Sequence, residues 1–203
     1  MEIKFNVLKI PSDLLPHSED EIDQFNEIAG YIYESILHSQ ASKVNLDEKI
    51  IPLSSFLQSK MVEGLLENIY HYMQMLKGAK YLSGDISISI SEAITYTALH
   101  TIYSVKLRNI IPFRTVKYLG IIADAVVDLS REEKLAKEVG SDSGLLFINI
   151  RSSMNPKSYQ IIDKIRKSLI NIETVRYPDS FGLISIVTLD RGELTDSFVF
   201  IIP

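Results

Sequence analysis

The sequence predicts an α/β protein in which a mostly helical α/β region, residues 1–140, packs on a small β-α-β-β-β domain, residues 141–203. Apolar residues recur at helical spacing through most of the first region. In the second region, apolar runs of strand length surround one helical pattern. The joining segment GSDSG, residues 140–144, is short for a flexible linker, so we expect the two regions to contact each other.

Helical spacing, alternation and capping signals define the elements expected in the first region. In order, they are a strand over 2–10, a helix over 18–39, a helix over 54–78, a strand over 85–91, a helix over 91–107, a helix over 112–129 opened by Pro112, and a short helix over 130–140. Ser18 with Glu21 and Ser130 with Glu133 have capping-box spacing. The strict alternation in DISISIS predicts the strand over 85–91. Gly140 is placed to end the last helix.

The second region is expected to contain four strands, two of them in a hairpin, and one helix. They are a strand over 144–153, a helix over 155–172 capped by Asn155 with Pro156 at its first position, a strand over 172–177, and a hairpin over 181–203 that turns around Arg191 and Gly192.

Composition and charge exclude several functional classes. The chain of 203 residues has no cysteine, which excludes disulfides, zinc–thiolate sites and thiol nucleophiles. From Ser141 onward there are seven basic and seven acidic residues, so the preceding 140 residues carry 14 basic and 19 acidic ones. Such a balance argues against strong non-specific DNA binding and favours a protein partner.

With no long apolar run and no signal peptide, we expect a cytoplasmic protein that does not contact a membrane.

Two stretches resemble the RecJ-like phosphoesterases of the DHH superfamily. The segment YLGIIADAVVDLSREEK, residues 118–134, resembles the end of the catalytic DHH domain, where a helix ends in a G-x-x-A-D-x-V motif. The matching positions are Gly120, Ala123, Asp124 and Val126. The segment LLFINIRSSMNPKSYQIIDKI resembles the DHH-associated domain, in which a strand ending in Arg-Ser precedes a helix, matched by Arg151 and Ser152. The similarity covers roughly residues 91–203.

The family's catalytic motifs are missing from this chain. Active members hold two divalent metals with several Asp and His side chains, which polarise a phosphodiester oxygen and an attacking water. This sequence has no Asp-His-His triad and no Asp-x-Asp strand, and it lacks the Gly-Gly-Gly-His phosphate segment, of which Gly182 alone is left. The four histidines are isolated from one another at His17, His38, His71 and His100.

A RecJ-like chain with these losses resembles the inactive, Cdc-forty-five-type replication factors, of which shortened archaeal forms occur with the GINS complex. The resemblance implies a non-catalytic protein without metal or other cofactor. It also implies GINS and the MCM helicase as partners, a role in DNA replication, and a nucleoid-associated location.

A second hypothesis is a residual metal-dependent phosphoesterase or nuclease that uses Asp124 with Asp85, Asp128 or His100. Asp124 and Asp128 are four residues apart and share a face if the helix extends that far. The structural alternative is that Asp124 is a relic of the metal site, or a helix-end group that accepts hydrogen bonds from local backbone amides.

A third hypothesis is a single-stranded nucleic-acid-binding module with weak or no DNA binding at physiological salt. Arg151, Ser152, Ser153 and Lys157 lie at a strand-to-helix turn, where cations and helix-start amides hold phosphate. The alternative is that Ser153 or Asn155 caps the helix and that Arg151 pairs with a neighbouring acid.

Overall fold

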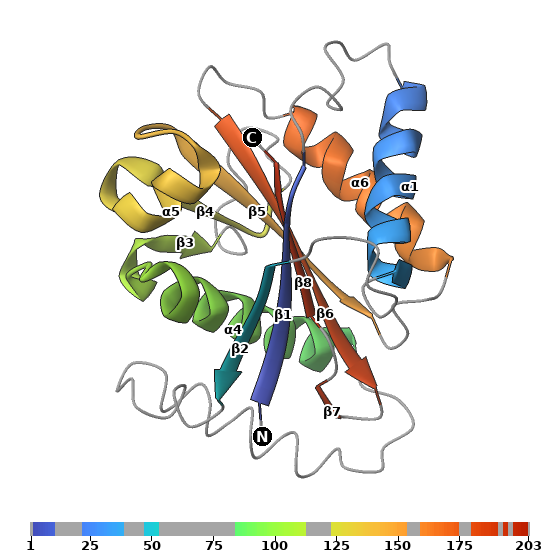
Figure 1. Cartoon of the computed structure of the whole chain (residues 1–203), viewed down its shortest axis with the longest axis horizontal. Helices are drawn as coiled ribbons and strands as arrows, with labels where there is room; N and C mark the ends of the chain where they lie inside the picture. The colour runs from blue at the N-terminus through green and yellow to red at the C-terminus, as the bar shows by residue number, and fades with distance from the viewer. Residues whose placement is uncertain are drawn as a thin grey trace.

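The structure is a computed structural model that describes residues 2–10, 22–38, 47–52, 84–112, 123–153, 159–174, 180–190, 193–194 and 197–202. These residues form a mixed α/β structure with one sheet, in the strand order β2-β1-β8-β6-β5-β4-β3 with β7 paired to β6 (Figure 1). The strands are β1 (Glu2–Lys9), β2 (Asp47–Pro52), β3 (Ile110–Pro112), β4 (Ala125–Asp128), β5 (Leu145–Ser153), β6 (Ser180–Asp190), β7 (Glu193–Leu194) and β8 (Ser197–Ile202). The helices are α1 (Ile22–His38), α4 (Gly84–Tyr103), α5 (Glu133–Val139) and α6 (Gln160–Thr174). No helix in these ranges is long and apolar enough to cross a membrane.

Strand β5 lies inside the sheet, between β4 and β6. Five consecutive residues from Leu146 to Ile150 are buried, as a strand covered on both faces requires. β5 pairs parallel with β6 and antiparallel with β4. Because parallel neighbours need a crossover connection, α6 links the carboxyl end of β5 to the start of β6.

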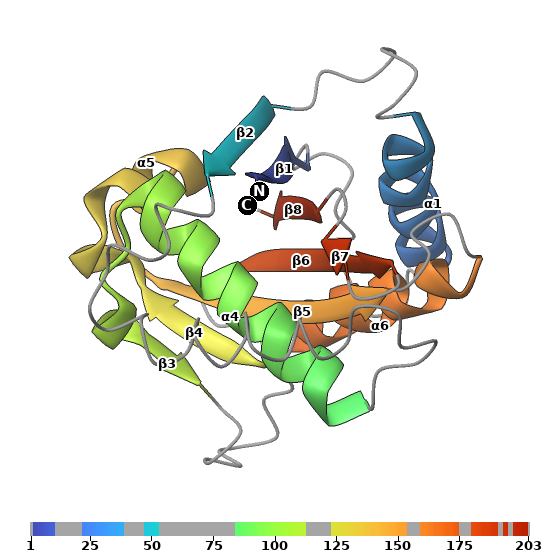
Figure 2. The same ribbon diagram turned by 90° about the horizontal axis from the view of Figure 1, so that it is seen from below.

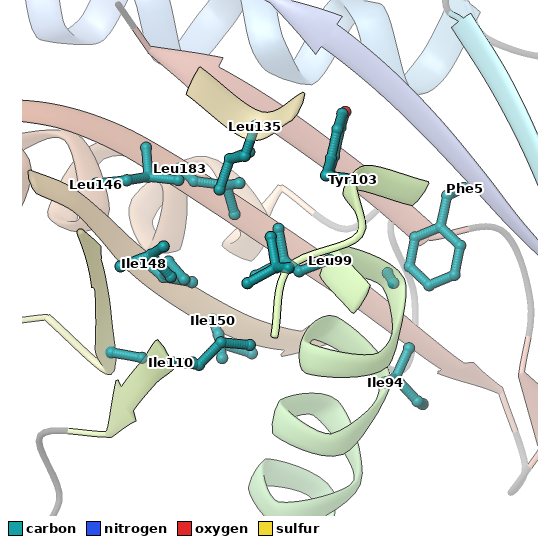
Figure 3. Packing of buried hydrophobic residues seen from close by; sticks show 14 of the residues in the cluster. Phe5, Ile94, Leu99, Tyr103, Ile110, Leu135, Leu146, Ile148, Ile150 and Leu183 are labelled. Carbon is teal, nitrogen blue, oxygen red and sulfur yellow. The ribbon is translucent and has the colours of Figure 1, made fainter. Parts of the chain in front are cut away.

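Helices cover the two faces of the sheet. α4 lies across β5 and β6 on one face, and α1 and α6 lie side by side on the other (Figures 1 and 2). Leu99 projects from α4 among Leu146, Ile148 and Leu183 (Figure 3). On the opposite face, Ile184 and Ile186 of β6 belong to the apolar cluster formed with α1 and α6. The sheet therefore has an apolar core on each face.

The sheet continues across residue 140. β1 pairs parallel with β8, and β4 pairs with β5, so strands from both predicted regions share one sheet. The coarse prediction of an α/β fold is confirmed. The boundary near residue 140 stays a prediction about how the chain is organised.

The strand predicted over residues 85–91 is wrong, because this segment forms the first turns of α4. A strand would place Ile88 and Ile90 on one face, but Ile88 is 44% exposed and Ile90 is 2% exposed. Buried Ala93, Ile94 and Ala98 continue at helical spacing beyond them. Burial of this face against the sheet overrides the short alternating pattern.

The helix predicted over residues 112–129 is also wrong over its described residues. Pro112 ends the strand β3, and residues 125–128 form β4, while residues 113–122 lie outside the described ranges. In β4, Ala125 and Val127 join the core on the α4 face, whereas Val126 contacts Phe147 on the other face. Both faces of this short segment are buried, so it lacks the polar face by which an amphipathic helix is recognised.

Several smaller predictions can also be compared with the structure. The strand predicted over 172–177 is wrong for residues 172–174, which end α6. Gly140 is confirmed as the end of α5, with φ of 91°. The capping box at Ser130 and Glu133 is wrong, because the residue before α5 is Glu132 and its side chain makes no cap. The remaining expectations lie outside the described residues: the helix over 54–78, Ser18 with Glu21, Asn155 with Pro156, and the turn at Arg191 and Gly192.

The remaining predicted strands and helices agree with the structure, whereas β2 and β3 were not predicted. β1, α1, β5 and α6 are confirmed with ends that differ by a few residues, and β6 pairs antiparallel with both β7 and β8. The helix predicted over 91–107 is confirmed as far as Tyr103.

Gly30 offers a test of the helical packing of α1. It lies inside the helix, and a Cβ built on it meets no atom within 4 Å. We expect Gly30→Ala to raise the free energy of unfolding by about 0.5–1 kcal/mol, because alanine loses less backbone entropy on folding. Urea denaturation measures this change.

Gly140 is the matched control, since its φ of +91° disfavours any other residue. We expect Gly140→Ala to lower the free energy of unfolding by about 1 kcal/mol in the same experiment. A destabilising Gly30→Ala would contradict the open environment of Gly30.

Candidate functional site

Asp124 lies immediately before β4 and connects it to β5. Its N–H donates to the Ile148 carbonyl at 2.8 Å, which continues the β4–β5 pairing by one residue. Its Oδ2 accepts hydrogen bonds from the Ile150 N–H at 2.6 Å and from Arg151 Nη1 at 3.0 Å. The carboxylate therefore binds both the Ile150 N–H and the Arg151 guanidinium of the neighbouring strand β5.

Arg151 is fixed by more than this ion pair. Nη1 also donates to the Ile150 carbonyl at 2.8 Å, and Nη2 donates to Asn149 Oδ1 at 3.0 Å. Asn149 and Arg151 are two residues apart on β5 and so point to the same face of the sheet. The guanidinium is held at the point where the buried part of β5 ends, with 22% of its side chain exposed.

Lys164 of α6 is a second cation at this end of β5. Its Nζ donates to the Ser152 carbonyl at 2.7 Å. Burial lowers the pKa of Lys164, and the positive charge of Arg151 lowers that pKa further. Ser152 follows Arg151 on β5, so the contact of Lys164 with the Ser152 carbonyl brings its charge to the strand end that carries Arg151. Two cations at one strand end favour a bound anion.

The other residues predicted for phosphate contact are only partly described. Ser152 and Ser153 are half-buried at the end of β5, and the Ser152 carbonyl is the acceptor for Lys164. Ser153 has bonding partners of its own. Lys157 lies outside the described residues. The described site thus consists of Arg151, Ser152 and Lys164 with the counter-ion Asp124.

The residues of the metal hypothesis are placed apart. Asp124 and Asp128 do not share a helix face, because the segment between them is the strand β4. Four residues of extended chain separate two Cα atoms by about 13 Å, which is too far for both carboxylates to bind one ion. Within the described ranges, no group of three His, Asp or Glu side chains is arranged to hold a metal ion.

Asp128 and His100 have other bonding partners. Asp128 accepts hydrogen bonds from the N–H and Oγ of Ser130 at 3.1 Å and 2.6 Å, and it pairs with Arg131 at 3.2 Å. His100 Nδ1 lies 2.8 Å from the Val105 carbonyl. Asp85 is in the first turn of α4, and its side chain is not among those described.

Sequence analysis alone missed Lys164 as a residue of the site and the exposure of Tyr159, which is near it in sequence. Lys164 belongs to the basic run KIRKS, which has the pattern of a solvated helix face, and nothing in that pattern indicates that it reaches Ser152. Tyr159, immediately before α6, is 75% exposed and lies five residues before Lys164. In the sequence, the signal for these two residues is an aromatic residue within a few positions of a cation. Reading it requires knowing that α6 begins at Gln160, directly after Tyr159.

Replacement of Asp124 tests its structural role. We expect Asp124→Ala to lower the free energy of unfolding by about 1–3 kcal/mol, because the Ile150 N–H loses its acceptor. Asp124→Asn keeps an acceptor oxygen in the same place and should cost less. Chemical denaturation of both variants measures the difference, and equal stability of Asp124→Ala and the wild type would contradict the assignment.

Comparisons with known proteins identify no relative. No family model matches the chain, and no curated protein or solved structure matches it either.

Proposed function

We propose that the chain is a non-catalytic DNA replication factor that binds the GINS complex and supports the MCM helicase. The observation that supports a non-catalytic role is the bonding of Asp124, the aspartate of the RecJ-like motif. Its Oδ2 already accepts from Arg151 Nη1 and from the Ile150 N–H. The guanidinium also repels any second cation at that carboxylate, so Asp124 is a poor ligand for a catalytic metal.

The described surface offers a place for a protein partner at the β3 side of the sheet. β3 ends the strand order among the described strands. Ile111 of β3 is 53% exposed, and Leu145 of β5 is 41% exposed. Their register partners are Val126 and Asp128, which are two residues apart on β4, so both side chains lie on one face of the sheet. Exposed apolar side chains near a sheet edge are typical of partner-binding surfaces.

Co-elution on a sizing column tests this proposal. We expect the wild-type chain to co-elute with the purified GINS complex at micromolar concentration. Ile111→Lys should weaken that binding at least about tenfold, because a lysine in an apolar contact must be desolvated.

Ile88→Lys is the matched control, since Ile88 is similarly exposed, at 44%, but belongs to α4. It should co-elute like the wild type. Separate elution of the wild-type chain and GINS would refute the proposed function, whereas equal binding by Ile111→Lys would refute only the surface.

The second candidate is a module that binds single-stranded nucleic acid, and the cation pair at the end of β5 favours it. Lys164 Nζ bonds to the carbonyl of Ser152, the residue after Arg151, and Tyr159 exposes its side chain just before α6. Cations that contact phosphates and an aromatic ring that stacks on a base are the two components of such sites.

Fluorescence anisotropy with a labelled oligothymidylate tests this candidate. We expect binding at low salt that weakens steeply toward about 0.15 M salt, as phosphate contacts do. Lys164→Ala should weaken the binding and reduce the slope of log K against log salt by about 0.7. Lys137→Ala is the control, because Lys137 is an exposed α5 residue paired with Glu133. Equal loss in both variants would indicate non-specific attraction only.

A further inference from the structure

We propose that Asp124 is an internal competitor for Arg151, and that this ion pair sets the affinity of the β5–α6 site for the phosphates of single-stranded DNA. The proposal rests on the second candidate function above and concerns how that site is regulated. It would make Asp124, the aspartate of the RecJ-like motif, an inhibitor of binding rather than a catalyst.

The donors around the Asp124 carboxylate are of the kinds that bind anions in proteins. Its Oδ2 accepts one bond from a guanidinium at 3.0 Å and one from a backbone N–H at 2.6 Å. Arginine and backbone amides are also the donors that bind phosphate oxygens in proteins. A phosphate that displaces the carboxylate from Arg151 would use the guanidinium N–H that Asp124 now occupies.

The charges at the site show why this competition matters. Among the described residues of the site, Arg151 and Lys164 are the cations, and Asp124 is the carboxylate that pairs with Arg151. Within the same described residues, Lys164 Nζ bonds to the Ser152 carbonyl and pairs with no acid. The acid nearest to Lys164 in sequence, Asp163, pairs with Arg166 at 3.6 Å. With Asp124 charged, the group carries a single net positive charge, and without that charge it carries two.

The ion pair is also accessible enough to be opened. The Asp124 side chain is 33% exposed, and that of Arg151 is 22% exposed. Pairs with this exposure are screened by water and salt, so a polyanion can compete with the carboxylate. A fully buried pair would instead be a fixed part of the core.

Asp124→Asn is the variant that separates charge from structure. The asparagine amide has nearly the shape of the carboxylate, and its oxygen continues to accept from the Ile150 N–H. Only the ionic partner of Arg151 is lost. Asp128→Asn is the matched control, because it removes the same charge at the other end of β4, from a residue bonded to Ser130 and Arg131.

The experiment measures binding of labelled oligothymidylate by anisotropy over a range of salt, on folded protein below the melting temperature of each variant. We expect Asp124→Asn to bind about tenfold more tightly than the wild type. Its slope of log K against log salt should be steeper by about 0.7, the value for one additional phosphate contact. Asp128→Asn should match the wild type, and Asp124→Asn combined with Arg151→Gln should lose the gain. Displacement of the labelled oligothymidylate by pyrophosphate is measured for both proteins. If Asp124→Asn also binds pyrophosphate more tightly than the wild type, the phosphate charge alone accounts for its tighter binding.

The outcomes distinguish the two hypotheses. If the wild type binds and folded Asp124→Asn binds no more tightly, the competitor role is refuted and the nucleic-acid-binding module stands. If neither protein binds even at low salt, both are refuted. Should Asp124→Asn fail to fold, Asp124→Ser provides the test, because it removes the same charge and keeps a side-chain oxygen that can accept a hydrogen bond. The proposal expects this variant also to bind more tightly than the wild type, and unchanged affinity of the folded variant would overturn it.

Discussion

The burial of β5 on both faces is the constraint on which the rest of the structure depends. Its residues from Leu146 to Ile150 are buried, and the strand contacts α4 on one face of the sheet and α6 on the other. A polar residue inside such a strand must be bonded, and Asn149, which is 1% exposed, accepts from Arg151. Polar chemistry is therefore confined to the carboxyl end of the strand, where Arg151, Ser152 and Ser153 are partly exposed.

The same constraint explains the position of Asp124. The Ile150 N–H lies at the end of the buried segment, and β4 is too short to supply a backbone acceptor there. The Asp124 carboxylate takes that place, and Arg151 neutralises it. A single side chain thus satisfies a buried donor and a partly exposed cation. Asp124 therefore has a structural role, and its charge affects any anion that approaches Arg151.

The strand register also relates the proposed partner surface to the phosphate site. Ile111, Val126 and Phe147 stand opposite one another on three neighbouring strands, and Leu145, Asn149 and Arg151 follow on the same face by the alternation of β5. α1 and α6 form their apolar cluster with β1 and β6, whereas Val126 and Phe147 form a separate small one. The uneven cover of this face leaves side chains at its β3 side and at the end of β5 accessible to partners.

The sequence by itself determined the α/β class, the strands β1 and β5, the helices α1 and α6, and the C-terminal hairpin, because each has a periodic apolar pattern longer than one turn or a clear alternation. It also singled out Asp124 and Arg151. It left open which acid pairs with Arg151, since the partner is 27 residues away and only the β4–β5 register brings the two together. The segment over 85–91 was mispredicted because packing of Ile90 and the following buried residues against the sheet overrides a short alternating pattern. In the segment over 112–129, residues 125–127 are buried although they alternate between the two faces of the sheet, so their apolar pattern does not distinguish a strand from a helix. There the tertiary structure decided, by placing one segment against the sheet and the other within it.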